Sequence, residues 1–314
     1  MVWWEDFQVG ERSEMGSHAF TEAEILAFGR QFDPQPFHTD TAAAAQTPFG
    51  GFDLAQRRRA RQAPRARMSA RIHLEHKIHV LTKKEELDSV RVPGKVVVVL
   101  DILFATTTMV TALAHGAIEV LPVLDEAAAR ALARRLPEDS YVLAGELYAE
   151  TLPGFAHPAP LSLLRHGVEG KSLVYSTTNG TVALAQCAGA SRIYCGALLN
   201  AGAIVARVLA EHPRETVLIV CSGSGNNFNY EDFYGAGCFV ERFADALGAA
   251  ADLSDAARAA RALYREARVP ESLLDCRVGR MMAARGLAAE VEFACREDAL
   301  PIVPVLQEGR LRIA

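Results

Sequence analysis

Acidic, hydroxyl and amide side chains follow aliphatic runs at several points in this chain. The run "VVVVLD" ends on Asp101 and is followed by "ATTT" at 105–108. Further along, "LAGE" ends on Glu146, "TTNGT" occupies 177–181, and "CSGSGNNFNYED" closes on an acidic pair at 231–232. A carboxylate at the end of a buried strand costs free energy unless a partner, such as a divalent metal, offsets its charge. The pattern therefore favours a site for a metal ion and an anion.

The chemistry that suits these residues is magnesium-assisted binding of a phosphate group. Mg²⁺ prefers oxygen ligands and often takes only a few carboxylates, so that waters and phosphate oxygens complete its shell. The backbone N–H groups of a helix that begins at "ATTT" can face an anion. The "TTNGT" segment offers similar small polar groups around a glycine.

Each residue also has a simpler explanation. Asp101 and Thr106 could only cap a helix, and "TTNGT" could be an ordinary turn. Glu146 could be a surface acid, and the pair at 231–232 could be acids in the first turn of a helix. No P-loop is present, and the "GSG" at 223–225 is too short for a dinucleotide fingerprint. These residues therefore form a site only if they meet at one edge of the sheet.

The elements that must position them alternate between aliphatic runs and helical patterns from about residue 77. Seven runs are typical of strands, at 95–101, 117–123, 141–145, 171–177, 192–197, 216–222 and 300–306. Amphipathic patterns predict helices at 125–136, 200–212, 231–247, 254–267 and 270–286. Continuous aliphatic strands separated by helices indicate an α/β fold, with a mostly parallel or mixed sheet and helices on both faces. Ligands of such sheets bind beyond the carboxyl ends of the strands.

Composition narrows the class of protein. The chain has 314 residues and a net charge of −5, which gives no reason to expect nucleic acid as a partner. No apolar run reaches the ~18 residues of a membrane span, and the first residues do not resemble a signal peptide. Six cysteines without CxxC spacing are expected to be buried and reduced, as in a cytoplasmic protein. The sequence leaves open whether the chain forms a homodimer.

The separated motifs from residue 77 to 314 resemble the 2-phosphosulfolactate phosphatase (ComB-like) family in order and spacing. The motifs are "VVVVLDILFATTTMVTALAHGA", "LAGE", "LPGF", "STTNGTVALA", "GALLNA", "SGSGNNFNYEDFYGAG" and "GRMMAARGLAAEVEFACREDALPIVPV". This resemblance implies an α/β, Mg²⁺-dependent phosphoric monoester hydrolase that acts on a small anionic phosphorylated hydroxyacid. A non-catalytic anion-binding protein on the same scaffold is the alternative.

The resemblance also implies roles for individual residues. The metal ligands expected, directly or through water, are Asp101, Glu146, Glu231 and Asp232. The residues expected to bind phosphate are Thr106, Thr107, Thr178 and Asn179. Asp101 and Asp232 are the expected catalytic acids, although the motifs do not say which of them activates water.

Three positions depart from the pattern of the family. Phe104, Leu147 and Val182 stand where the family usually has arginine. Three lost charge-assisted hydrogen bonds would weaken binding of a dianionic substrate by roughly 4–9 kcal/mol in total. We therefore expect a less anionic and more apolar phosphate ester, or loss of catalysis, unless Arg165 or Arg277 replaces the missing charge.

The first part of the chain resembles a different family. Residues 3–51 resemble the start of MaoC-like enoyl-CoA hydratases, with Asp33 and His38 in "FDPQPFH" as the matching acid and base. The likeness stops at Gly51, too early for a complete hot-dog fold, so a hydratase would need a partner chain to complete it. Residues 52–72 hold seven arginines and one acid, and either a solvated linker or an arm for anionic surfaces would have this composition.

The predicted organisation is therefore a truncated, hot-dog-like fragment at 1–51, a disordered arginine-rich linker at 52–72 and a phosphatase-like domain at 73–314. In this arrangement Met68 is a candidate for the natural start of the α/β part.

Overall fold

The computed structural model of the chain describes residues 76–314, together with Thr21 and Glu24. The chain divides into two units, Met1–Ile72 and His73–Ala314. The hot-dog-like fragment predicted at 1–51, with Asp33 and His38, and the linker predicted at 52–72 therefore lie outside the described residues.

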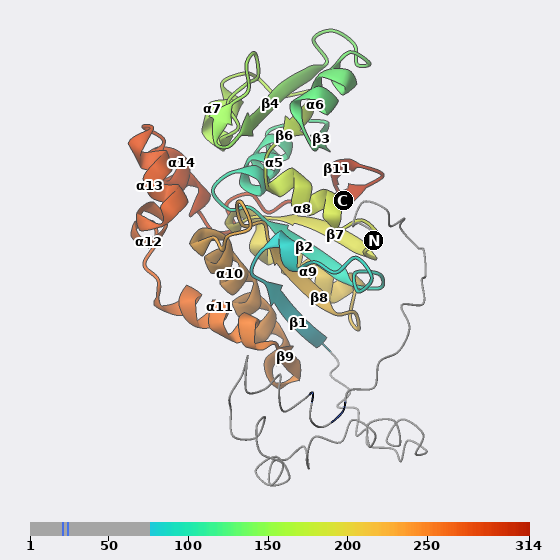
Figure 1. Cartoon of the computed structure of the whole chain (residues 1–314), viewed down its shortest axis with the longest axis vertical. Coiled ribbons are helices and arrows are strands. Elements are labelled where there is room, and N and C mark those ends of the chain that lie inside the picture. The colour runs from blue at the N-terminus through green and yellow to red at the C-terminus, as the bar shows by residue number, and fades with distance from the viewer. Residues whose placement is uncertain (1–20, 22–23, 25–75) are drawn as a thin grey trace. The chain divides into compact units, whose positions relative to one another are not determined.

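The described residues form one mixed, eleven-stranded sheet (Figure 1). Its strand order is β5-β4-β6-β3-β11-β10-β7-β2-β8-β1-β9. The strands are β1 (His76–Leu81), β2 (Val96–Leu100), β3 (Glu119–Val123), β4 (Tyr141–Leu147), β5 (Glu150–Thr151), β6 (Ser172–Ser176), β7 (Arg192–Gly196), β8 (Val217–Cys221), β9 (Ala251–Leu253), β10 (Pro304–Gln307) and β11 (Arg310–Ile313). The predicted α/β fold with a mixed sheet is confirmed.

A hairpin of β10 and β11 joins two parallel halves of the sheet. On one side β4, β6 and β3 are parallel, and on the other side β7, β2, β8, β1 and β9 are parallel. The hairpin runs antiparallel to both halves: Val305 pairs with Tyr194 of β7, and Leu311 pairs with Val120 of β3. The sequence predicted the first hairpin strand but not the second, because "RLRI" is short and half of it is charged.

Helices cover both faces of the sheet, and β2 shows why its residues are all apolar. Val96, Val98 and Leu100 face the core beneath α9, α10 and α11, whereas Val97 and Val99 face the core beneath α5 and α8. Strand side chains alternate between faces, so a central strand covered on both sides must be aliphatic throughout. The helices are α5 (Ala105–Ala114), α6 (Glu126–Ala133), α7 (Pro160–Leu164), α8 (Gly180–Gln186), α9 (Ala201–Glu211), α10 (Tyr230–Leu247), α11 (Asp255–Glu266), α12 (Glu271–Asp275), α13 (Arg277–Ala284) and α14 (Ala288–Ala294).

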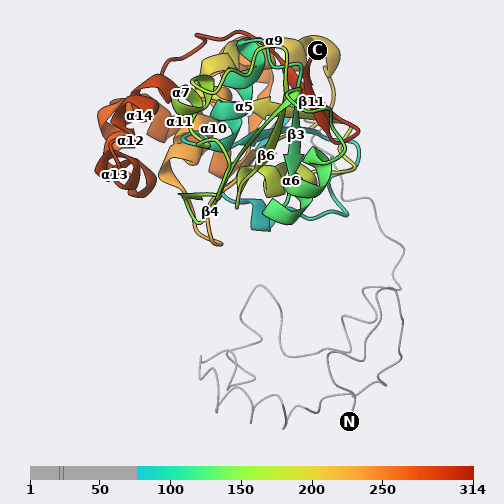
Figure 2. The same ribbon diagram turned by 90° about the horizontal axis from the view of Figure 1, so that it is seen from above.

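The helix predicted at 270–286 is two helices. Cys276 has an extended ψ of 166°, which ends α12, and its Sγ accepts the Gly279 N–H and so caps α13. The sequence did not indicate this break, because cysteine is not a usual capping residue. Helices α12 to α14 lie together at one side of the described unit in both views (Figures 1 and 2).

The sequence predicted buried, reduced cysteines and no membrane-spanning segment. All six cysteines are free, and five of them are buried. Among the helices of the described part, none is both long and apolar enough to cross a membrane.

Candidate functional site

A cleft of about 360 Å³ opens where the strands of both parallel halves end. Residues that follow or end β2, β4, β6 and β8 line it, and Arg277 and Met281 of α13 form part of its wall. The cleft therefore lies at the edge of the sheet that the sequence predicted.

Asp101 follows β2 directly and lines the cleft. Its backbone N–H donates to Thr106 Oγ1 (2.8 Å), and the Thr106 hydroxyl donates back to the Asp101 carbonyl oxygen (3.0 Å). Burial raises the pKa of the Asp101 carboxyl to about 7; the N–H of Ala105 opposes this rise, and the negative charges of Glu146 and Glu231 add to it. Asp101 is thus held rigidly by its own turn, in a position where its charge is costly.

Gly180, at the start of α8, packs against the same carboxylate. A Cβ atom at Gly180 would lie 2.8 Å from Asp101 Oδ2 and 2.3 Å from the Cβ of Ala105. Neither contact is sterically tolerable, so the glycine of "TTNGT" is required for α8 to approach Asp101 and α5 this closely.

The structure does not bring Thr106 and Thr107 into the cleft. Both side chains are fully buried. The hydroxyl of Thr106 is engaged with the Asp101 backbone, and that of Thr107 donates to the Ile102 carbonyl oxygen (2.5 Å). Local hydrogen bonds of this kind fix the start of a helix, so these threonines shape the turn rather than face a ligand.

Glu146 and Thr178 meet at the edge of the cleft. Glu146 Oε1 accepts the Thr178 N–H (2.6 Å), and Oε2 accepts both the Thr178 hydroxyl (3.1 Å) and the Ala149 N–H (2.5 Å). Both oxygens of this carboxylate therefore organise the loops after β4 and β6. Asn179 also lines the cleft.

Lys84 supports Asn179, a contact that no motif in the sequence indicates. This lysine is buried, and its Nζ donates to Asn179 Oδ1 (3.1 Å) and to the Ser222 carbonyl oxygen (3.2 Å) while it pairs with Glu85 (3.0 Å). Its charge also lowers the pKa of Asp101. In the sequence, "KKEE" reads as an exposed charged turn, and only the fold shows that its second lysine is internal.

The two acids of α10 have different environments. Glu231 lines the cleft and accepts a hydrogen bond from Cys276 Sγ (3.2 Å). Asp232 is buried beside the cleft, where its Oδ1 accepts the Ile102 N–H (2.9 Å) and its Oδ2 accepts the Gly223 N–H (3.0 Å). Burial raises the pKa of both carboxyls, and the charges of Asp101 and Glu231 raise that of Asp232 further. Asp232 thus ties the segment after β2 to the loop after β8.

The four predicted metal ligands gather in one place, but not as a closed cage. Asp101, Glu146 and Glu231 line the cleft, and Asp232 lies next to them. Among the described residues, however, no three His, Cys, Asp or Glu side chains form a cluster that could hold a metal ion. Glu146 and Asp232 each accept two backbone N–H groups. The donor set therefore fits an ion that takes one or two carboxylates, from Asp101 and Glu231, and completes its shell with water and substrate, as Mg²⁺ does.

One arginine lines the cleft, and it comes from a distant part of the sequence. Arg277 Nη2 donates to Asn229 Oδ1 (2.8 Å) and to Ser224 Oγ. Of the three positions that depart from the family pattern, Phe104 lines the cleft and Leu147 lines a neighbouring hollow. The position of Arg277 in the cleft thus favours the alternative that this residue replaces the charge of the missing family arginines.

Fold and site together define an α/β protein with an acidic small-ligand cleft at the carboxyl edge of its sheet. The family model for 2-phosphosulpholactate phosphatase matches residues 81–309, and the chain belongs to that family.

Curated relatives agree with this assignment. A probable 2-phosphosulfolactate phosphatase of Symbiobacterium thermophilum is 37% identical over 221 residues, which are 69% of this chain and 94% of the relative. Proteins of the same name from Carboxydothermus hydrogenoformans and Clostridium beijerinckii are 35% and 29% identical, over 70% and 74% of this chain and 90% and 97% of those relatives.

Proposed function

We propose that the chain hydrolyses the phosphate monoester of a small hydroxyacid, with Mg²⁺ as its cofactor. Its relatives are named as phosphatases of one such ester, 2-phosphosulfolactate. The observation that carries the proposal is the placement of Asp101, Glu146 and Glu231 around one cleft that also holds Arg277. A cleft with this set of charges suits a metal ion and an anionic ligand together.

Asp101 and Glu231 would hold Mg²⁺, which would neutralise charge on the phosphate group and activate a water molecule. Arg277 would bind an anionic oxygen of the substrate, since its guanidinium forms charge-assisted hydrogen bonds. Thr178 and Asn179 would border the phosphate. In this proposal Asp232 is a positioning residue that fixes Ile102 and Gly223, and Asp101 remains the catalytic acid.

Phosphate release tests the proposal. The full chain should release inorganic phosphate from 2-phosphosulfolactate or a related phosphorylated hydroxyacid in the presence of Mg²⁺, and release should stop when EDTA removes the metal. Binding of the ester without any phosphate release, measured by calorimetry in Mg²⁺, would instead favour a non-catalytic anion-binding protein.

A further inference from the structure

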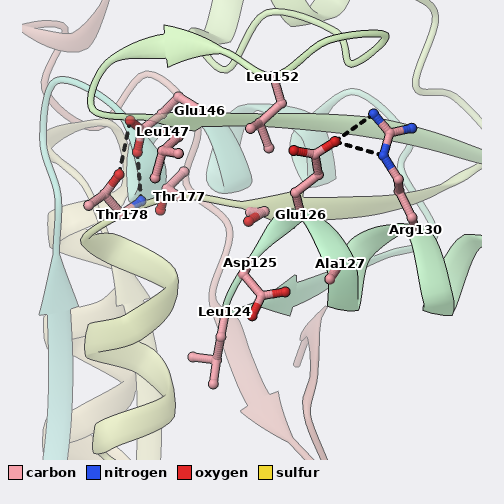
Figure 3. A pocket seen from close by; sticks show the side chains of 11 residues that line it. Leu124, Asp125, Glu126, Ala127, Arg130, Glu146, Leu147, Leu152, Thr177 and Thr178 are labelled. Atoms are coloured by element: carbon pink, nitrogen blue, oxygen red, sulfur yellow. Dashed lines mark hydrogen bonds and ion pairs between the residues drawn. The ribbon is translucent and has the colours of Figure 1, made fainter.

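A second hollow, of about 450 Å³, adjoins the cleft on the side of β4 and α6 (Figure 3). Glu146, Thr177 and Thr178 line both cavities. A ligand whose phosphate lies beside Asp101 therefore has one neighbouring space into which the rest of the molecule can extend past Thr178.

Leucine side chains form much of the wall of this hollow. Leu152 points toward the start of α6, and Leu147 lies on the other side of the hollow near Thr177 (Figure 3). Leu147 is 53% exposed, and Leu124, also in the lining, is 57% exposed. Single exposed leucines are ordinary on protein surfaces, but two around one hollow beside a catalytic cleft form an apolar surface that a ligand can cover. Covering such surface favours binding, because apolar area is removed from water.

The charges around the hollow disfavour an anion. Asp125 caps α6 by accepting the Ala128 N–H (2.7 Å), and Glu126 and Glu146 add two more carboxylates to the lining. Arg130 is the one cation among the lining residues that the structure describes there.

The guanidinium of Arg130 is already engaged. It pairs with Glu126 (2.7 Å), donates to the Pro153 carbonyl oxygen (2.6 Å) and lies 4.9 Å from the centre of the Phe155 ring. A sulfonate or carboxylate in the hollow would therefore meet an excess of negative charge, and the Arg130 guanidinium would not be free to pair with it.

We propose that this hollow is a specificity subsite for an uncharged, apolar group of the substrate, an alkyl or aryl side chain on the phosphorylated hydroxyacid. The inference rests on the proposed function, because the phosphate of the same molecule must lie in the cleft. Leu147 is the residue that sets the preference, since it lines the hollow directly after Glu146, which lines both cavities, and its side chain is exposed there.

The experiment compares two esters that differ in one group, 2-phospho-3-phenyllactate and 2-phosphosulfolactate. For the unchanged chain we expect kcat/KM to be at least tenfold higher for the phenyl ester, which corresponds to about 1.4 kcal/mol. Leu147→Arg should lower kcat/KM for the phenyl ester and raise it for the sulfonated ester, so that the ratio changes by tenfold or more. Val90→Arg adds the same charge at an exposed apolar position that does not line either cavity, and should leave the ratio unchanged.

The outcomes separate the two proposals. A preference for the sulfonated ester, or a ratio that Leu147→Arg does not change, would overturn the apolar subsite while phosphate release still supports the proposed function. Release from neither ester would overturn the proposed function. The subsite would then be decided by calorimetric binding of the same two esters, and equal dissociation constants in the unchanged chain would overturn it as well.

Discussion

Glu119 at the start of β3 and Asp232 near the start of α10 are both buried carboxylates, but their partners differ. Glu119 is paired with Arg310 (2.8 Å) and Arg312 (2.5 Å) of the hairpin strand β11. Those arginines outweigh burial and hold the pKa of the Glu119 carboxyl below its usual range. Among the described residues, Asp232 accepts hydrogen bonds only from backbone N–H groups. Burial therefore raises its pKa, and the charges of Asp101 and Glu231 raise it further.

The comparison distinguishes acids that hold the fold together from acids that are retained for a site. Glu119 is neutralised within the protein and ties β3 to β11 of the hairpin. The cleft acids repel one another, an arrangement that lowers stability until a cation binds. Buried carboxylates without their own cations are therefore a stronger indication of function than buried carboxylates as such.

The largest expected effect is loss of catalysis on neutralising Asp101. Asp101→Asn should lower kcat for phosphate release by about 10²–10⁴-fold, the range for removal of one catalytic acid or base. The melting temperature without metal should stay the same or rise, because the substitution removes a buried negative charge. Asp245→Asn changes an exposed acid of α10 and should alter neither value. A large loss of stability in Asp101→Asn would place Asp101 with Glu119, among the acids of the fold.

The second largest effect is expected at Gly180, which lies against Asp101. Gly180→Ala would force a Cβ into Ala105 and the Asp101 carboxylate, so we expect a destabilisation of about 1–3 kcal/mol from overpacking and at least a tenfold loss of kcat. Gly202→Ala at the start of α9 is the matched control, because its Cβ would meet only the flexible carboxylate of Asp298 at 3.1 Å. Thermal unfolding and phosphate release measured on both variants test this, and equal behaviour would contradict the close approach of α8.

A smaller effect, on stability alone, is expected at the hairpin. Glu119→Gln should lower the free energy of unfolding by about 1–2 kcal/mol, at the low end for charged hydrogen bonds because Arg310 and Arg312 are half exposed. Glu211→Gln breaks an ion pair with Arg207 in which the acid is exposed rather than buried, and it should lower the free energy of unfolding by about 0.5 kcal/mol or less. Urea unfolding monitored by circular dichroism measures the free energy of unfolding of both variants. An equal loss in the two would show that Glu119 contributes no more than an ordinary surface acid.

The smallest effect is a difference in the sign of the pH dependence, measured in EDTA. The pKa of Glu119 is depressed in the folded chain, so its contribution is present above the ordinary value of 4.5 and is lost as pH falls through the folded pKa. The pKa of Asp101 is raised from 3.8 to about 7, so its cost is absent below 3.8 and grows as pH rises toward 7. Relative to the unchanged chain, Asp101→Asn should therefore gain melting temperature, by a few degrees, as pH rises from 4 to 7. Glu119→Gln should lose its disadvantage in stability only below pH 4.5, as pH falls through the depressed pKa of Glu119 in the folded chain.

Much of the sheet was predictable because its strands carry a strong local signal. The central strands β2 and β8 are apolar throughout, and their parallel pairing places Asp101 and the loop that leads to Glu231 at one edge of the sheet. β11 was not predictable in the same way, because Arg310 and Arg312 look like exposed charges until Glu119 of a distant strand is seen beside them.

Contacts that depend on distant segments limited the prediction of the site. The positions of Asp101, Glu146 and Asn179 at the cleft follow from the motifs. Nothing local indicates that Lys84 turns inward to Asn179, because its partners lie 95 and 138 residues away in the sequence. Thr106 and Thr107 lie outside the cleft for the opposite reason, since their hydroxyls donate to carbonyl oxygens only five residues earlier in the chain.

The place of the β10–β11 hairpin in the sheet has a consequence for the synthesis of the chain. Strands β3 and β7 are both made long before residues 304–313, yet within the sheet of the described residues the two parallel halves are hydrogen-bonded to each other only through this hairpin. A nascent chain can form each half as it leaves the ribosome, but the open edges of β3 and β7 remain unpaired until the hairpin emerges. During that interval the protein should depend on chaperones more than a fold whose central strands are made first.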